Sequence, residues 1–245
     1  MSLALSACDQ AATKGETAAL DSGTKSAKSG SASAADIAML SGVWQRSGGS
    51  LTPSKLTEYG KSKSAGTGVF DDPTTRCEGF SIPRSTISEF GVTQIVVEEG
   101  AVTISYEGEG DRRIPLDGKT PGKSASIAGQ SIARINRGSI EIESNNFGPE
   151  GKNMMLAPGI EGAGTVYPLS ADFTLFERYT PIDANTLDFV MVMNDPKMTV
   201  WPRVIHAKWT RIEDDAFIPG ECVLPERPFA ADGKGATTTT DRTGK

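Results

Sequence analysis

Apolar and polar residues alternate with a period of two through the middle and the C-terminal half of the chain, and this pattern limits the fold more than any other feature. Residues 94–98 and 101–106 lie on either side of Glu99-Gly100, and residues 131–136 and 139–143 lie on either side of Arg137-Gly138. Two-residue connections that contain glycine are typical of β-hairpins. Residues 173–179, 187–194 and 199–213 continue as a meander with short turns.

This pattern predicts an all-β domain. Eight or more antiparallel strands with short turns form a barrel or a strongly curved sheet, and a domain of roughly 190 residues matches a lipocalin-like barrel with added loops. A two-sheet sandwich is the alternative. Short N-terminal helices are expected from Asp36 to Leu40 and from Thr52-Pro53 towards Lys61.

Both ends of the chain have low apolar content. Residues 9–35 are mainly Ala, Ser, Gly, Thr and Lys, and the first aromatic residue is Trp44. Such a segment cannot bury enough apolar surface to offset its ordering entropy. We therefore expect a flexible linker at residues 9–35, a single β-rich domain at 36–229 and a disordered tail at 230–245.

Cys8 lies ahead of this linker, in the stretch Leu5-Ser6-Ala7-Cys8. The stretch resembles the cleavage box of bacterial lipoproteins, in which the cysteine thiol becomes acylated. A full signal peptide needs a basic region and about 7–15 apolar residues, so residues 1–8 are expected to be the residual end of a signal with its anchor cysteine. The resemblance implies a periplasmic protein that is held to a membrane lipid through Cys8. A chance cysteine in a disordered tail is the alternative.

The other two cysteines, Cys77 and Cys222, lie near opposite ends of the expected domain. In an oxidising periplasm they can form a disulfide that closes a loop of about 145 residues, worth roughly 5 kcal/mol in the chain-entropy model. Two unpaired buried thiols are the alternative.

Charge and motif content argue against several functions. A net charge of −6 argues against a surface that binds nucleic acid. A single histidine and the lack of a close cysteine pair fit no common zinc pattern, and no glycine-rich phosphate loop precedes a helix. We therefore expect no metal, no cofactor and no nucleic-acid partner.

Charged residues within strand-like sequence are candidates for a site, because a charge that points into a barrel must be paired or must bind a ligand. Exposure on the polar side of each strand is the alternative. The period of two places Glu177 with Phe173, Leu175 and Tyr179, and a carboxylate among aromatic groups suits acid–base chemistry. The residues expected to line a ligand site are Arg84, Arg113, Asp117, Gln130, Arg134, Tyr179 and Trp201.

His206 is the only histidine in the chain. It lies on the opposite face from Trp201, Ile205 and Trp209, so it points into a barrel only if the tryptophans lie outside. In that arrangement His206 and Glu177 would be the two catalytic proton carriers of an enzyme. If the tryptophans fill the core, His206 is a surface residue. Ser131 loosely matches a nucleophile motif, but its strand-like surroundings favour a serine that lines the core.

Several fragments, taken together and in order, resemble a large family of uncharacterised, exported, β-rich bacterial proteins. The fragments are residues 72–77, Ile82-Pro83-Arg84, Arg113-Ile114 with Leu116-Asp117-Gly118, Gly129-Gln130-Ser131-Ile132-Ala133, Phe176-Glu177-Arg178-Tyr179, and Asp195-Pro196 followed by Trp201-Pro202. The family usually reads G-H-S-I-G-x-W where this chain has Gln130, and D-P-x-x-Y/F-T-x-P-W at the last fragment. The match spans about residues 42–223 and implies export and a β-rich fold, without an activity. Because Gln130 replaces the family histidine, no mechanism can depend on that histidine here.

Three functions are compatible with these features. The first, which we favour, is a membrane-anchored lipoprotein whose barrel binds a small, partly apolar molecule. The second is a cofactor-free lyase, isomerase or hydrolase for such a molecule, with Glu177 and His206 as proton carriers and Arg113 or Arg134 as the anion holder. The third is an accessory subunit of a membrane complex. Placement of Glu177 and His206 on opposite sides of the sheet would contradict that enzymatic pairing.

Overall fold

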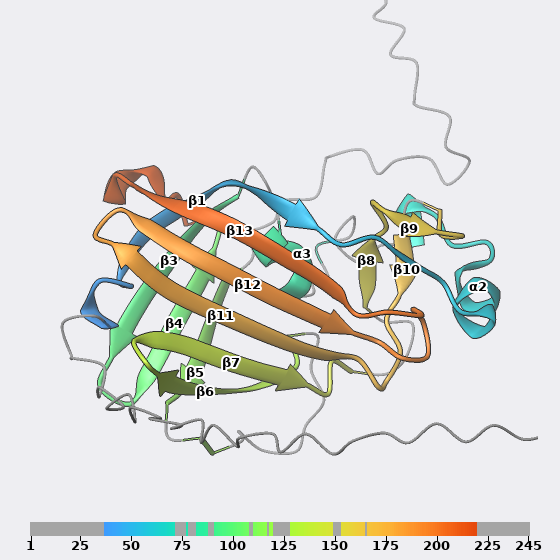
Figure 1. Ribbon diagram of the computed structural model, residues 1–245, viewed down its shortest axis with the longest axis horizontal. Helices are drawn as coiled ribbons and strands as arrows, with labels where there is room; N and C mark the ends of the chain where they lie inside the picture. Colours follow the sequence, from blue (N-terminus) through green and yellow to red (C-terminus); the bar gives the residue numbers. More distant parts are fainter. Residues whose placement is uncertain are drawn as a thin grey trace, which may run out of the picture. The chain divides into compact units, whose positions relative to one another are not determined.

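The protein folds around one strongly curved, nearly closed antiparallel sheet (Figure 1). The structure is a computed structural model that describes residues 37–71, 77, 82–87, 91–107, 110–116, 118–119, 128–148, 153–164 and 166–219. Nine strands lie in the order β5-β4-β3-β1-β13-β12-β11-β7-β6. The predicted all-β class, with a barrel or strongly curved sheet, is confirmed. The strands are β1 (Gly42–Leu51), β3 (Val92–Glu98), β4 (Ala101–Tyr106), β5 (Gly110–Pro115), β6 (Gln130–Asn136), β7 (Ser139–Asn145), β11 (Thr174–Asp183), β12 (Thr186–Asn194) and β13 (Arg203–Ile212).

The two predicted hairpins are confirmed. β3 pairs with β4 so that Glu98 faces Ala101, and β6 pairs with β7 so that Asn136 faces Ser139. In the second turn Arg137 and Gly138 have positive φ angles of 50° and 85°. Two consecutive positive φ angles are typical of the tight turns whose twist matches that of the flanking strands.

A bulge in β1 accompanies the curvature of the sheet. The register between β1 and β13 shifts between Arg46 and Gly49. Ahead of the bulge β1 pairs with β3 as well, from Gly42 to Gln45, whereas its second half pairs with β13 alone. A bulge bends a strand and increases its twist. The sheet curls until its edge strands β5 and β6 come into contact, without a backbone ladder between their described residues.

Alternate side chains of every strand fill the interior of the curved sheet. At one end the rings of Tyr179, Phe189 and Trp209 pack together, with centroid distances of 4.9 to 5.6 Å. Trp44 lies fully buried and donates a 2.9 Å hydrogen bond to the carbonyl oxygen of Leu40. This end of the interior is therefore a packed aromatic core.

Short elements lie beside the curved sheet. β8 (Met154–Leu156) pairs with β10 (Val166–Pro168), and β2 (Ser54–Lys55) pairs in parallel with β9 (Ile160–Glu161). The helices are α2 (Glu58–Ser64) and α3 (Ile82–Ile87), and the short 3-10 helices are η1 (Val69–Asp71) and η3 (Asp214–Ala216). No helix within the described residues is long and apolar enough to cross a membrane.

The second predicted N-terminal helix, from Thr52-Pro53 towards Lys61, is wrong in its position, because the helix begins at Glu58. Thr57, and not Thr52, is the N-cap, because its side chain accepts a 2.9 Å hydrogen bond from the amide of Gly60. Thr52 instead accepts a hydrogen bond from the amide of Val204, which holds this segment against β13. Of the expected helix from Asp36 to Leu40, residues 37–40 are described, and residues 37–38 are helical as predicted.

Candidate functional site

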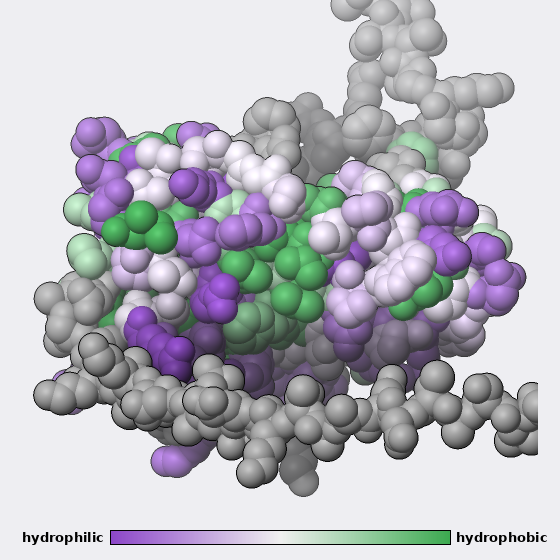
Figure 2. Space-filling view, viewed as in Figure 1, coloured by the Kyte–Doolittle hydropathy of each residue, from purple (hydrophilic) through white to green (hydrophobic). Residues whose placement is uncertain are grey.

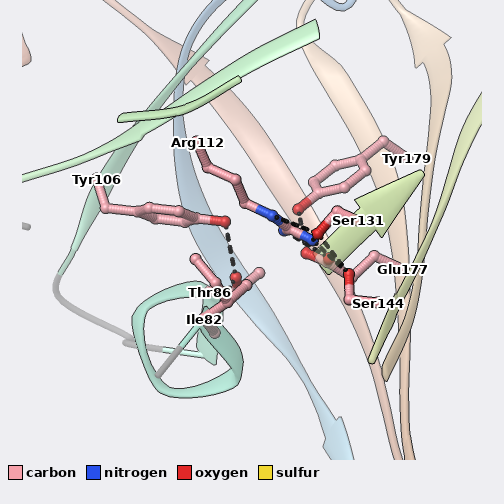
Figure 3. A network of polar contacts seen from close by, with 8 residues as sticks. All are labelled: Ile82, Thr86, Tyr106, Arg112, Ser131, Ser144, Glu177 and Tyr179. Carbon is pink, nitrogen blue, oxygen red and sulfur yellow. Dashed lines mark hydrogen bonds and ion pairs between the residues drawn. The ribbon is translucent and has the colours of Figure 1, made fainter. Parts of the chain in front are cut away.

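A cluster of polar side chains lies inside the curved sheet, among mostly apolar neighbours (Figure 3). Its centre is an ion pair between Arg112 of β5 and Glu177 of β11, with 2.7 Å between Nη1 and Oε2. The side chain of Arg112 is 6% exposed, and that of Glu177 is completely buried. An ion pair with so little exposure is uncommon, because each charge must give up its hydration.

Serine hydroxyls accept the other hydrogen bonds of Arg112. Ser131 Oγ of β6 accepts from Nε at 3.3 Å and from Nη2 at 2.9 Å, and Ser144 Oγ of β7 accepts from Nη2 at 2.6 Å. The two serine hydroxyls are themselves 2.9 Å apart. Arg112 therefore joins the two edge strands, β5 and β6. No backbone hydrogen-bond ladder connects the described residues of these two strands.

Two tyrosines extend the cluster in opposite directions. The hydroxyl of Tyr179 donates to Glu177 Oε1 at 3.0 Å. The hydroxyl of Tyr106 lies 3.0 Å from Oγ1 of Thr86, which donates its own hydrogen to the carbonyl oxygen of Ile82. Tyr106 is therefore the donor to Thr86, and this bond ties helix α3 to the interior of the sheet.

The surroundings of the cluster shift the pKa of three of its members. Burial raises the pKa of Tyr106 to about 12, and the charge of Glu177 adds to this effect, while Arg112 and Thr86 oppose it. Burial and the charge of Glu177 also raise the pKa of Tyr179 well above its ordinary value. Burial, the largest single effect, lowers the pKa of Arg112, but the charge of Glu177, the two neighbouring tyrosines and the hydrogen bond to Glu177 together outweigh it, and the pKa is raised. Both tyrosines therefore stay protonated in neutral solution.

The cluster offers fixed hydrogen-bonding groups in place of a free charge. The charges of Arg112 and Glu177 balance one another, the hydroxyl of Tyr106 can accept a further hydrogen bond, and one of the hydroxyls of Ser131 and Ser144 keeps a hydrogen to donate. Such an arrangement suits an uncharged polar group of a bound molecule. Among the described residues, no three His, Cys, Asp or Glu side chains gather where a metal ion could be held.

Two of the predicted site residues, Glu177 and Tyr179, lie in this cluster. Arg113 and Arg134 do not lie in the cluster. Side chains alternate between the two faces of a strand, and these two residues are on the outward-facing side of β5 and β6. Arg113 pairs with Glu98 at 3.4 Å with both side chains more than half exposed. Arg134 bonds Glu141 and Glu143 on the neighbouring β7.

The remaining predicted residues are dispersed. Arg84 is half-buried on α3, and Gln130 is half-buried at the start of β6. Trp201 is 54% exposed, and the ammonium group of Lys55 lies 5.3 Å from its ring centroid. Cys77 is half-buried. Asp117, Cys8 and Cys222 lie outside the described residues.

The prediction that pairs Glu177 with His206 in one cavity is wrong. Trp209 fills the core, so His206 points outward, and its side chain is 59% exposed. The register places Glu177 opposite Met191 and His206 opposite Val190, on the two faces of the sheet. The imidazole Nε2 instead lies 2.8 Å from Asp188 Oδ1, beside an outer hollow of about 280 Å³. The residues that line this hollow are Ser47, Gly48, Gly49, Asp188, His206, Ala207 and Lys208.

Arg112, the centre of the cluster, is not among the predicted site residues, although the sequence contains a signal for it. Arg112 precedes Ile114 by two residues, so it shares the buried face of β5, whereas Arg113 does not. Ser131 was expected to line the core, and it is 7% exposed. In the same way, Tyr106 lies two residues after Ile104 on β4, and Ser144 lies two residues after Ile142 on β7, so both share the buried face of their strand.

The outer face of the sheet carries an apolar row. Phe176, Val192 and Val204 face one another across β11, β12 and β13, and all three are half-buried. Figure 2 shows a hydrophobic area over these strands on the face that it presents. The row is a candidate contact surface.

Comparison of the sequence with protein-family models and with curated proteins finds no match.

Proposed function

We propose that this protein is a periplasmic lipoprotein, anchored to a membrane through Cys8, whose barrel binds a small, partly apolar molecule. The observation that carries the proposal is the Arg112–Glu177 pair, which lies at the centre of a buried polar cluster. The apolar interior would take the apolar part of the molecule, and the cluster would take a polar group. Binding sites of this kind combine an apolar lining with a few convergent polar groups.

Energetics support a functional role for the cluster. Replacing a buried ion pair by well-packed apolar side chains is often neutral or stabilising. The interior of this sheet is built mainly from Ile, Leu, Met and aromatic residues, so apolar side chains would suit the positions of Arg112 and Glu177. A charged pair at this point therefore needs a reason beyond stability, and ligand recognition supplies one.

The membrane anchor is supported by the sequence around Cys8 and by the linker that follows it. Acylation at Cys8 would hold the domain at the membrane, and residues 9–35 would let it reach roughly 30 Å from the surface. Fractionation of cells tests this part. We expect the full chain in the membrane fraction and the Cys8→Ser variant in the soluble fraction. Equal distribution of the two would contradict the anchor.

Binding can be tested without knowledge of the ligand. Native mass spectrometry of gently purified protein should reveal a carried small molecule, and emptied protein should take up a neutral apolar dye. The informative variant is the double substitution Arg112→Met with Glu177→Leu, which removes the polar cluster and keeps an apolar interior.

The matched control is Arg113→Gln with Glu98→Gln, an exposed ion pair between β5, the strand that also carries Arg112, and β3. We expect the control to keep the carried molecule and the cluster variant to lose it. Bare protein in the native spectrum, together with no uptake of dye, would overturn the binding proposal.

The outer apolar row favours a second candidate, an accessory subunit of a membrane complex. The side chains of Phe176, Val192 and Val204 would then pack against another protein. Gentle extraction of membranes followed by size-exclusion chromatography tests it. We would expect the wild-type protein to co-elute with larger species and the Val192→Asp variant to elute without them. Elution of the wild type as a single small species excludes the accessory-subunit function.

A further inference from the structure

A second arginine, Arg203, lies inside the curved sheet at the end where β8 and β10 cover it. It is the first residue of β13, and it shares the interior face with Ile205 and Trp209. Its neighbour across the ladder is Met193 of β12. The residue is 1% exposed, which makes it the more deeply buried of the two interior arginines.

Main-chain carbonyls hold the guanidinium group of Arg203. Nη1 donates to the carbonyl oxygen of Leu156 at 3.3 Å, and Nη2 donates to that of Pro158 at 2.6 Å. Nε is buried without a hydrogen-bond acceptor in the described part of the protein. No carboxylate of the described residues forms an ion pair with Arg203, in contrast to Arg112, which has Glu177.

Two other polar side chains of the described residues lie at this end, Asp195 and Tyr167, and neither forms an ion pair with Arg203. Asp195 is buried, but its Oδ2 accepts from the amide of Ser170 and its Oδ1 accepts from the hydroxyl of Ser170 and the amide of Met198. Burial raises the pKa of Tyr167, the charge of Arg203 and a hydrogen bond with Arg203 oppose the rise, and the charge of Asp195 adds to it. Tyr167 is therefore a neutral phenol in neutral solution and cannot balance the charge.

A buried guanidinium that lacks an ion-pair partner is costly, because dipoles of carbonyl groups replace only part of its hydration. A water molecule could satisfy the hydrogen of Nε, but it would leave the guanidinium without an ion-pair partner. A carboxylate or phosphate group satisfies both needs, since it accepts directed hydrogen bonds from the planar guanidinium and carries the opposite charge.

We propose that Arg203 binds the anionic group of the ligand, which makes the ligand an amphipathic anion. This inference rests on the proposed binding function and names the chemical class of the bound molecule. The anionic group would lie under β8 and β10, where Arg203 Nε lacks an acceptor.

The geometry also gives the ligand a length. Arg203 lies two residues along β13 from Ile205. Ile205 pairs with Met191 of β12, and Met191 pairs with Glu177 of β11. Two residues along a strand and two strands across separate Arg203 from Glu177 by roughly 12 Å. Met191 and Met193 lie on the interior face between the two sites, and methionine side chains adapt readily to an apolar chain. The ligand would therefore be a chain of about this length, anionic at the Arg203 end.

Two probes that differ only in charge test this inference. Dodecanoate and methyl dodecanoate have the same chain, but only the acid can pair with Arg203. We expect calorimetry at low ionic strength to give at least about tenfold tighter binding of the acid to wild-type protein. Arg203→Gln should bring the acid down to the affinity of the ester, and Arg203→Lys should retain part of the preference.

Matched variants separate the possible outcomes. Arg134→Gln removes an exposed strand arginine and should leave the preference for the acid unchanged. Equal binding of acid and ester by the wild type would overturn the role of Arg203 and leave the proposed function standing. A preference that survives Arg203→Gln would also overturn it. Binding of neither probe, with no uptake of neutral dye, would remove the proposed function itself. If Arg203→Gln does not fold, Arg203→Lys replaces it, and an undiminished preference for the acid in that variant would overturn the role of Arg203.

Discussion

Arg112 Nη1 lies 2.7 Å from Glu177 Oε2, and this contact connects β5 to β11. In the order of the sheet five strands separate β5 from β11 on one side, and β7, β6 and the open seam separate them on the other. The same guanidinium group bonds Ser131 on the opposite edge strand. Side chains therefore close the barrel where the backbone does not. Unpaired strand edges are prone to pair with other chains, and here each edge lies against the other.

The first prediction concerns removal of one or both partners of this pair. Glu177→Leu or Arg112→Met alone should lower the free energy of unfolding by about 3–5 kcal/mol, because each leaves a buried charge without its partner. The double variant should regain most of that loss. Denaturation in urea measures all three values and gives the coupling energy.

The exposed pair Arg113–Glu98 is the control, since both side chains are more than half exposed. The corresponding substitutions there should change stability by less than about 1 kcal/mol. Additive losses in the Arg112 and Glu177 variants would contradict the assigned role of the pair.

The second prediction is a loss of stability in alkaline solution. The pKa of Tyr106 is raised to about 12 by burial, whereas an unfolded tyrosine titrates near 10. The folded protein therefore binds more protons than the unfolded chain above pH ~10. The contribution is fully present below pH ~10 and decreases by about 2–3 kcal/mol as the pH rises to ~12. Tyr179, whose pKa is also raised, acts in the same direction.

Tyr106→Phe provides the test of that contribution. It should reduce the slope of stability against pH between about 10 and 12, and it should cost about 1 kcal/mol in neutral solution through loss of the bond to Thr86. Unfolding curves followed at several pH values, with phenolate absorbance as a second signal, measure both effects. An unchanged alkaline slope in the variant would show that Tyr106 is not responsible.

The third prediction compares two neighbouring glycines in the bulge of β1. Gly48 and Gly49 both have positive φ, 136° and 148°, so alanine is strained at either position. A Cβ atom at Gly48 would meet no atom within 4 Å, whereas one at Gly49 would lie 2.5 Å from the carbonyl oxygen of His206. Gly49→Ala should therefore be more destabilising than Gly48→Ala by about 1–3 kcal/mol. Thermal unfolding of the two variants measures the loss of stability in each. Equal losses of stability would contradict the prediction and would mean that the bulge can shift.

The sequence predicted those parts of the fold that local patterns determine. Ile140 and Ile142 alternate with polar residues beside Arg137-Gly138, so that hairpin follows from pattern and turn chemistry alone. β1 was not predicted, because Gly48 and Gly49 give it no strand pattern. Its pairing with β13 and β3, far away in the sequence, makes it a strand.

The candidate site could be predicted only in part, for a related reason. The alternation of side chains along a strand was enough to place Glu177 inside the sheet. Arg112 lies two residues before Ile114, and Arg203 lies two residues before Ile205, so the same alternation predicts that both arginines are buried. What this alternation cannot give is the contact of Arg112 with Ser131. That contact depends on how far the sheet curls, and no local sequence pattern encodes the distance between two edge strands.

The fourth prediction concerns the two cysteines of the domain. Cys77 is half-buried with a positive φ of 53°, and its expected partner, Cys222, lies outside the described residues. If the two form a disulfide, Cys77→Ser, Cys222→Ser and the double variant should all lose the same amount of stability, up to roughly 5 kcal/mol. Two unpaired buried thiols would instead give losses that add. The measurement is urea denaturation of each variant in the Cys8→Ser background, with alkylation before reduction to count free thiols. Full alkylation of the unreduced protein would exclude the disulfide whatever the stabilities.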